Sequence, residues 1–139
     1  MVNLVLGAKG NGKTKYMLEH ANQEAKESDG LVIYLDKNSE HMFQLDRLIR
    51  LINVKEYPVN SLDSLLGFIC GLVAGNGDIV SIYFDSFLIL SEITADEAAD
   101  AFKKLFVLSD RLGVDFTVSA SIDAGDVPEE YKEHIVKTL

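Results

Sequence analysis

The chain has 139 residues, of which 47% are hydrophobic and 25% are charged. This length and composition are typical of one globular domain and exclude a disordered segment, so we expect a single domain over residues 1–139. The formal net charge of −9, from 13 basic and 22 acidic side chains, disfavours a nucleic-acid-binding surface, which needs a basic patch.

Three further sequence features bear on location. The longest uncharged apolar run, Leu65–Gly75, is too short to span a bilayer, and no signal peptide is visible, so we expect a cytoplasmic protein. Cys70 has no partner for an internal disulfide and is expected to be a small buried residue. The three histidines are scattered and predict no zinc cluster.

A glycine-rich motif dominates the start of the chain. Val2–Leu6 is an apolar run that predicts a buried strand, and Lys15–Lys26 is compatible with a helix. Between them, Gly7–Thr14 reads GAKGNGKT and fits the pattern G-x-x-x-x-G-K-[ST] at every fixed position. Strand, glycine loop and helix together predict a loop that binds the phosphates of a nucleoside triphosphate.

The chemistry of such a loop assigns a role to each residue type. Backbone N–H groups form a concave nest for the phosphates at a helix N-terminus, and glycines permit close approach. The Lys13 ammonium is expected between the β- and γ-phosphates, and the Thr14 hydroxyl at Mg²⁺. The expected nucleotide-binding residues are Gly7, Ala8, Lys9, Gly10, Asn11, Gly12, Lys13 and Thr14.

The middle of the chain continues to alternate between strands and helices. Leu31–Leu35 predicts a second buried strand that ends at Asp36, and a polar loop follows. Arg47–Val54 favours a short strand because β-branched residues are frequent and Tyr57-Pro58 stops it. Asn60 is then expected to cap a helix that continues to Ala74.

The second half of the chain predicts two more strands and two more helices. Ile79–Phe84 reads as a strand closed by Asp85, and the apolar Phe87–Leu90 as a continued buried segment. Thr94–Glu97 is a capping-box sequence that opens a long amphipathic helix, which ends at Gly113. Phe116–Ser121 is expected to be the last strand, and a terminal helix is expected to begin at residues 126–129.

This alternation predicts a three-layer α/β fold, with a mainly parallel sheet of about five strands and helices on both faces. Ligands of such sheets bind at the carboxyl ends of the strands. The candidate positions are therefore Gly7, Asp36, Asp85, Ser119, Ser121 and Asp123.

Asp85 is the expected metal-side carboxylate. It follows the apolar strand IVSIYF, and a carboxylate at that strand end can hold the water shell of Mg²⁺ against Thr14. We therefore predict that Thr14 and Asp85 hold Mg²⁺ as a cofactor and that ATP is the ligand. ATP is preferred to GTP because no N-K-x-D segment is present.

With GAKGNGKT as a Walker A motif and IYFDS as a Walker B motif, the chain resembles P-loop NTPases of the RecA-like class. The Asp85-Ser86 pair is similar to the strand-end Asp-Ser of RecA and its relatives. The segment FTVSASID resembles the thymidine-kinase arrangement of the same core, without the zinc-binding cysteines of that family. The length and composition are also similar to short bacterial P-loop proteins, some of which are labelled twitching-motility ATPases.

The resemblance implies a glutamate that polarises the attacking water, but Ser86 stands directly after Asp85 where many relatives have it. Asp36 is the catalytic candidate beside Lys13 and Asp85, and Glu40 and Glu92 are less well supported. Ser119, Ser121 and Asp123 are candidates for a polar sensor of the γ-phosphate. Each arginine, at positions 47, 50 and 111, is a candidate for an arginine finger across a subunit interface.

Three functions remain open from the sequence. The first is an ATP-binding protein with slow or partner-stimulated hydrolysis. The second is a nucleotide-controlled interaction module, with a second copy or another protein as partner and without significant turnover. The third is a small-molecule or nucleoside kinase, which would need an acceptor pocket beside the phosphates.

Overall fold

The computed structural model describes residues 1–10 and 12–139 and contains a six-stranded sheet. Neighbouring strands are parallel throughout, in the order β3-β2-β4-β5-β1-β6, so β5 lies between β1 and β4. The strands are β1 (Val2–Leu6), β2 (Leu31–Asp36), β3 (Arg50–Asn53), β4 (Ile79–Phe84), β5 (Asp115–Ala120) and β6 (Ile135–Thr138). The expected parallel sheet is confirmed, with six strands where about five were expected.

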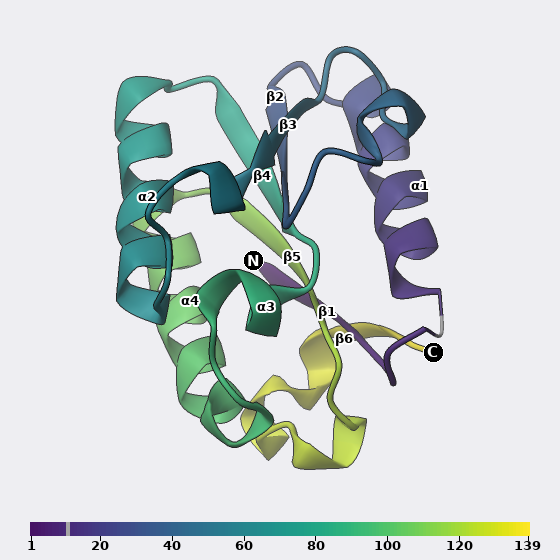
Figure 1. Cartoon of the computed structure of the whole chain (residues 1–139), viewed down its shortest axis with the longest axis vertical. Helices are drawn as coiled ribbons and strands as arrows, with labels where there is room; N and C mark the ends of the chain where they lie inside the picture. Colours follow the sequence, from purple (N-terminus) through teal and green to yellow (C-terminus); the bar gives the residue numbers. More distant parts are fainter. Residues whose placement is uncertain (11) are drawn as a thin grey trace.

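Helices cover both faces of the sheet, which confirms the three-layer α/β fold. They are α1 (Lys13–Glu27), α2 (Leu62–Gly75), α3 (Phe87–Ser91) and α4 (Ala98–Leu112). Figure 1 shows α1 on one face and α2, α3 and α4 on the other. Among the described residues, no helix is both long and apolar enough to cross a membrane.

The sheet separates two apolar cores. The larger one lies under α2, α3 and α4 and includes the fully buried rings of Phe84, Phe87 and Phe102. The smaller one lies under α1 and includes Met17 and Tyr34. The strand β2 contributes to both cores, because its alternate residues point to opposite faces: Ile33 and Leu35 enter the larger core, and Val32 and Tyr34 the smaller one.

Local capping signals fix the helix ends. Thr94 and Glu97 form the expected capping box at a 3₁₀ turn that leads into α4, and Gly113 ends α4 with a left-handed φ of 66°. The cap of α2 differs from expectation, because Ser61 rather than Asn60 occupies the N-cap. The Ser61 side chain accepts from the Ser64 N–H, and the Ser64 hydroxyl accepts from the Ser61 N–H in return.

The prediction of a terminal helix from residues 126–129 is wrong. Glu129–His134 forms a 3₁₀ helix, and the chain then enters β6, which pairs in parallel with β1. Two of the four residues of β6 are Ile and Val and one is Thr, and such β-branched side chains favour strands. Phe116–Ser121 is consequently not the last strand, and β5 ends at Ala120.

Two apolar predictions need smaller corrections. Cys70 is half-buried rather than buried, since the fully buried residues of α2 are Leu65 and Ile69. Phe87–Leu90 forms most of the short helix α3, in which Phe87 and Leu90 are buried as expected. Ile89, on the opposite side of α3, is 45% exposed.

Candidate functional site

The parallel sheet brings the carboxyl ends of its strands to one edge. Leu35 of β2 pairs with Phe84 of β4, so the following residues, Asp36 and Asp85, lie at neighbouring strand ends. β5 lies on the other side of β4 and adds Ser119, while the glycine loop leaves β1 one strand further along. The candidates separated in sequence therefore converge through topology alone.

A cavity of about 340 Å³ opens at this edge. Its described lining includes five residues of the glycine loop and the start of α1, and five residues from other strand ends and α3. These are Lys9, Gly10, Gly12, Lys13, Thr14, Lys37, Asp85, Ser86, Ile89 and Ser121. The lining thus includes three lysines, in a chain whose net charge is −9.

The structural reason that favours glycine differs between Gly7 and the other loop glycines, Gly10 and Gly12. Gly7 has a φ of 146°, and a Cβ there would collide with the backbone carbonyl oxygen of Leu139, which follows β6. Gly10 and Gly12 have φ values of 86° and 89° with open space around them, so only their conformation favours glycine. Asn11, predicted to bind nucleotide, lies outside the described residues.

Lys13 is held by the loop that precedes it. Its ammonium donates hydrogen bonds to the carbonyl oxygens of Gly7 at 2.8 Å and Ala8 at 2.9 Å. Burial lowers the pKa of Lys13 below its usual range, while the Asp85 carboxylate opposes this shift. Lys13 also begins α1, whose N-cap Gly12 has no side chain and whose first turn carries no acidic residue. The positive end of the helix dipole therefore faces the cavity without an acidic side chain in that turn to neutralise it.

The carboxylate of Asp85 is a hub of hydrogen bonds. Its Oδ1 accepts from Thr14 and from Ser119, each at 3.2 Å, and its Oδ2 accepts from the Tyr34 hydroxyl at 2.7 Å. Burial and the Asp85 carboxylate raise the pKa of Tyr34 far above its usual range, so this hydroxyl remains a donor. These contacts fix both oxygens of a residue that is 1% exposed.

Ser86 and Ser119 anchor the turn that leads from Asp85 into α3. Ser86 has a left-handed φ of 64°, and its N–H donates to the Ser119 hydroxyl at 2.8 Å. The Ser119 hydroxyl therefore contacts both Asp85 and the residue after it. Ser119 thus supports the Asp85 carboxylate from below, while Ser121 lines the cavity itself.

Asp36 lies beside this hub but is fully buried, with one carboxylate oxygen, Oδ2, left without a hydrogen-bond partner. Its Oδ1 accepts from the backbone N–H of Lys37 at 2.8 Å. Burial, and next the nearby Asp85 carboxylate, raise the pKa of Asp36, although Lys37 opposes the shift. Asp36 is not among the described residues that line the cavity.

Other candidates remain apart from the cavity lining that the structure describes. Asp123 is exposed beyond the end of β5. Glu40 pairs with His41 at 3.5 Å, and Glu92 with Lys55 at 3.1 Å. Each of the three arginines, at positions 47, 50 and 111, is exposed on an outer surface.

Two residues of the site, Tyr34 and Lys37, were not predicted from the sequence. Tyr34 lies inside an apolar run, and only the pairing of β2 with β4 directs its hydroxyl to Asp85. Lys37 follows Asp36 at a strand end, and its ammonium lies 3.4 Å from the Ser86 hydroxyl. The position of Lys37 after an apolar strand was an available signal, since such positions face the ligand edge.

Comparisons with known proteins give a match among solved structures but none among sequences. No protein-family model and no curated protein sequence matches the chain. Among solved structures, the chain is similar to PCH-2 of C. elegans, with a TM-score of 0.49 and 13% sequence identity. The likeness covers 99% of this chain but only 34% of PCH-2. We draw no functional conclusion from a likeness of this size.

Proposed function

We propose that this protein is a P-loop NTPase of the RecA-like class that binds ATP with Mg²⁺ in the cavity beside the glycine loop. One observation carries the proposal: the fold brings Thr14 and Asp85, 71 residues apart in sequence, to 3.2 Å in a cavity lined by lysines. Thr14 belongs to the glycine-rich motif, and Asp85 to the apolar strand that ends in an aspartate.

The charge of the cavity supports binding of a triphosphate. Lys9, Lys13 and Lys37 supply three positive groups against the single carboxylate of Asp85. The N-terminus of α1 adds free backbone N–H groups and the positive end of its dipole. Lys13 is fixed by two loop carbonyls, so its remaining N–H group is oriented before a phosphate arrives.

The residues at the strand ends also fit Mg²⁺. This ion prefers oxygen ligands and is usually held by one or two carboxylates, water molecules and substrate phosphates. The Thr14 hydroxyl and the Asp85 carboxylate would hold it, and it would neutralise charge on the β- and γ-phosphates. Tyr34 and Ser119 orient Asp85 for this task by occupying part of its hydrogen-bonding capacity.

The proposed hydrolysis is slow or depends on a partner. Asp85 is engaged by four hydroxyl groups, and Asp36 is buried with a raised pKa, so neither is a ready base for an attacking water. Asp36 stays our candidate for the base, reached only after a local rearrangement opens its buried Oδ2 to the cavity. A partner that completes or rearranges the site would then accelerate turnover.

A second candidate is a nucleotide-controlled interaction module, and the placement of α3 favours it. α3 begins two residues after Asp85, and its exposed Ile89 lines the cavity. A bound nucleotide would therefore contact α3 and alter the surface that Ile89 presents. A second copy of the chain or another protein could read that surface.

Calorimetry with ATP, GTP and their diphosphates, each with and without Mg²⁺, tests the proposal. We expect saturable binding that Mg²⁺ strengthens and that the γ-phosphate improves. Absence of saturable binding by all four nucleotides would overturn it.

Phosphate release measured on the same samples separates the two candidates: slow turnover supports the ATPase, and nucleotide-dependent self-association without turnover supports the module. Phosphate transfer to an added nucleoside would instead indicate a kinase.

A further inference from the structure

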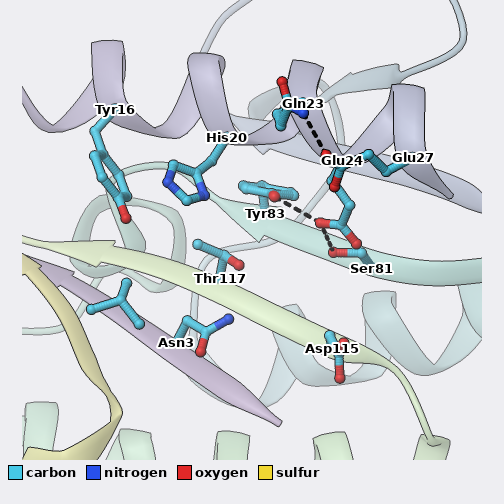
Figure 2. Close-up of a pocket in the computed structure, with 11 residues that line it drawn as sticks. Asn3, Tyr16, His20, Gln23, Glu24, Glu27, Ser81, Tyr83, Asp115 and Thr117 are labelled. Atoms are coloured by element: carbon cyan, nitrogen blue, oxygen red, sulfur yellow. Dashed lines mark hydrogen bonds between the residues drawn. The ribbon is translucent and has the colours of Figure 1, made fainter.

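A second cavity, also of about 340 Å³, lies under α1 toward the amino ends of the strands. The helix contributes Tyr16, His20 and Glu24, and the sheet contributes Ser81, Tyr83 and Thr117. Figure 2 shows the helix side chains extending toward the polar residues of β4 and β5. This volume is in the range that holds a small organic molecule.

Several polar residues of the sheet lie on the face that α1 covers. On the opposite face, β1 and β5 present apolar residues throughout, such as Leu4 and Phe116. On the α1 face, β1 presents Asn3, β5 presents Asp115 and Thr117, and β4 presents Ser81. Ser81 is 1% exposed, and buried polar groups carry a cost unless they have partners. If these positions served only to pack against α1, apolar residues there would stabilise the fold more.

The central group of this cavity is the carboxylate of Glu24. Its Oε1 accepts hydrogen bonds from the Tyr83 hydroxyl at 2.7 Å and the Ser81 hydroxyl at 2.9 Å. Burial, and next the hydrogen bond to Glu24, raise the pKa of Tyr83 well above its usual range, so the hydroxyl remains a donor. Within the described residues, Oε2 of Glu24 accepts no hydrogen bond. Glu24 is thus a fixed carboxylate with one oxygen free to accept.

The charge around Glu24 is negative. Glu27 and Asp115 also line the cavity, and no lysine or arginine does so among the residues that the structure describes. Asp115 forms an ion pair with the amine of Met1 at 3.3 Å. Within the described chain, Glu24 and Glu27 are then the carboxylates of the lining that have no cationic partner. Tyr16 and His20 stack on each other with ring centroids 4.2 Å apart and form an aromatic wall.

We propose that this cavity binds a small organic cation, with its ammonium or guanidinium group on Glu24 and its body against the Tyr16–His20 wall. A carboxylate fixed by buried donors gives a charge-assisted hydrogen bond at little cost in side-chain entropy. The aromatic wall adds a cation–π contact. Nothing in this site overlaps the described lining of the cavity at the glycine loop.

Calorimetric titration of the full chain with spermidine, an ammonium ligand, and with agmatine, a guanidinium ligand, tests this site. The titration is done at about 0.15 M salt, where exposed charges are largely screened. We expect saturable binding of at least one of the two, with a stoichiometry of one. Absence of saturable binding of both would overturn the proposal.

Matched variants locate the site. Glu24→Gln keeps an oxygen acceptor for Ser81 and Tyr83 but removes the charge, and it should weaken binding about tenfold or more. Glu19→Gln changes an exposed glutamate of α1 that does not line the cavity, and it should leave binding unchanged. Equal weakening by both variants would show general attraction to an acidic surface and would overturn the proposal.

NMR of the unaltered chain locates the site without relying on Glu24→Gln, which could lose binding through a folding defect. The side-chain amide NMR signals of Asn3 and Gln23 report from the cavity lining, whereas those of Asn60 and Asn76 lie elsewhere. We expect the cation to shift the first pair and not the second; equal shifts of both pairs would contradict the proposal. Tyr16→Ala, at a helix position where alanine is well tolerated, should weaken binding about threefold or more.

Discussion

The two cavities under the ends of α1 have the same volume, about 340 Å³, and opposite charge. The cavity at the glycine loop is lined by three lysines and one carboxylate, and the second cavity by three carboxylates and no described lysine or arginine. One helix serves both: Lys13 and Thr14 begin it, and Glu24 and Glu27 end it. The cavity at the N-terminus of α1 is therefore the more positive of the two, as binding of an anion there would require.

Two stacked tyrosines lie between the cavities. The Tyr34 and Tyr83 rings are 5.9 Å apart and nearly parallel. Tyr34 donates to Asp85 in one cavity, while Tyr83 donates to Glu24 in the other. The same residue type thus donates to a carboxylate in each cavity, because β2 and β4 are neighbours and Tyr34 is in register with Tyr83.

Among substitutions that test the difference between the two cavities, we expect the largest effect at Asp85, the proposed ligand of Mg²⁺. Asp85→Asn removes the charge that would hold Mg²⁺, and its amide N–H group would face donors from Thr14 and Tyr34. We expect the Mg²⁺-dependent part of ATP affinity to fall about a hundredfold, measured by calorimetry. Asp78→Asn, an exposed change before β4, is the control. Retention of the full Mg²⁺ effect in Asp85→Asn would show that the metal is held elsewhere.

Tyr34→Phe tests the connection between the tyrosine pair and Asp85. Removal of the hydroxyl leaves Oδ2 of the buried Asp85 without its donor, so the free energy of unfolding should fall by about 2 kcal/mol. Urea unfolding measures this change, with Tyr57→Phe, at a half-exposed ring, as the control. An unfolding free energy equal to that of the unaltered chain would mean that Asp85 finds another donor.

The smallest effect concerns Asp36. Its pKa is raised in the folded state, so folding favours the protonated form, and its contribution to stability is lost as pH rises from its ordinary pKa of 3.8 through the raised value. Asp36→Asn resembles the protonated form at every pH. We expect this variant to gain about 1 kcal/mol over the unaltered chain at neutral pH.

Thermal unfolding between pH 4 and pH 8 measures the difference. The advantage of Asp36→Asn should grow with rising pH, and Asp29→Asn, at an exposed turn, should show no such trend. A difference between Asp36→Asn and the unaltered chain that stays constant over this range would contradict the assignment. Loss of phosphate release in Asp36→Asn would in addition support its role as the base.

The sequence predicted those parts of the site that depend on local patterns. The glycine loop and Asp85 are marked by short motifs at strand ends, and the parallel fold then brings them together. Tyr34 could not be predicted, because its role depends on the register between β2 and β4. The second cavity depends on how α1 lies over the sheet, although Asn3, Ser81 and Thr117 interrupt apolar strands and were a visible signal.

The error at the carboxyl end of the chain has a related cause. The acidic residues and Pro128 near position 128 are typical of a helix start, and they begin only a 3₁₀ helix. The edge of β1 offers backbone partners to β6, and this long-range pairing outweighs the local helical signal. Local propensity therefore determined most elements, but the sixth strand was determined by its neighbour.

The most direct test of the central claim is the melting temperature with and without ATP and Mg²⁺ for the unaltered chain, Lys13→Ala and Lys15→Ala. A ligand that binds only the folded state raises the melting temperature. Lys13 lines the cavity, whereas Lys15, two residues later in the same first turn of α1, is exposed and is not among the described lining residues. We predict a rise for the unaltered chain and for Lys15→Ala and none for Lys13→Ala. An equal rise in all three proteins would contradict nucleotide binding at the glycine loop.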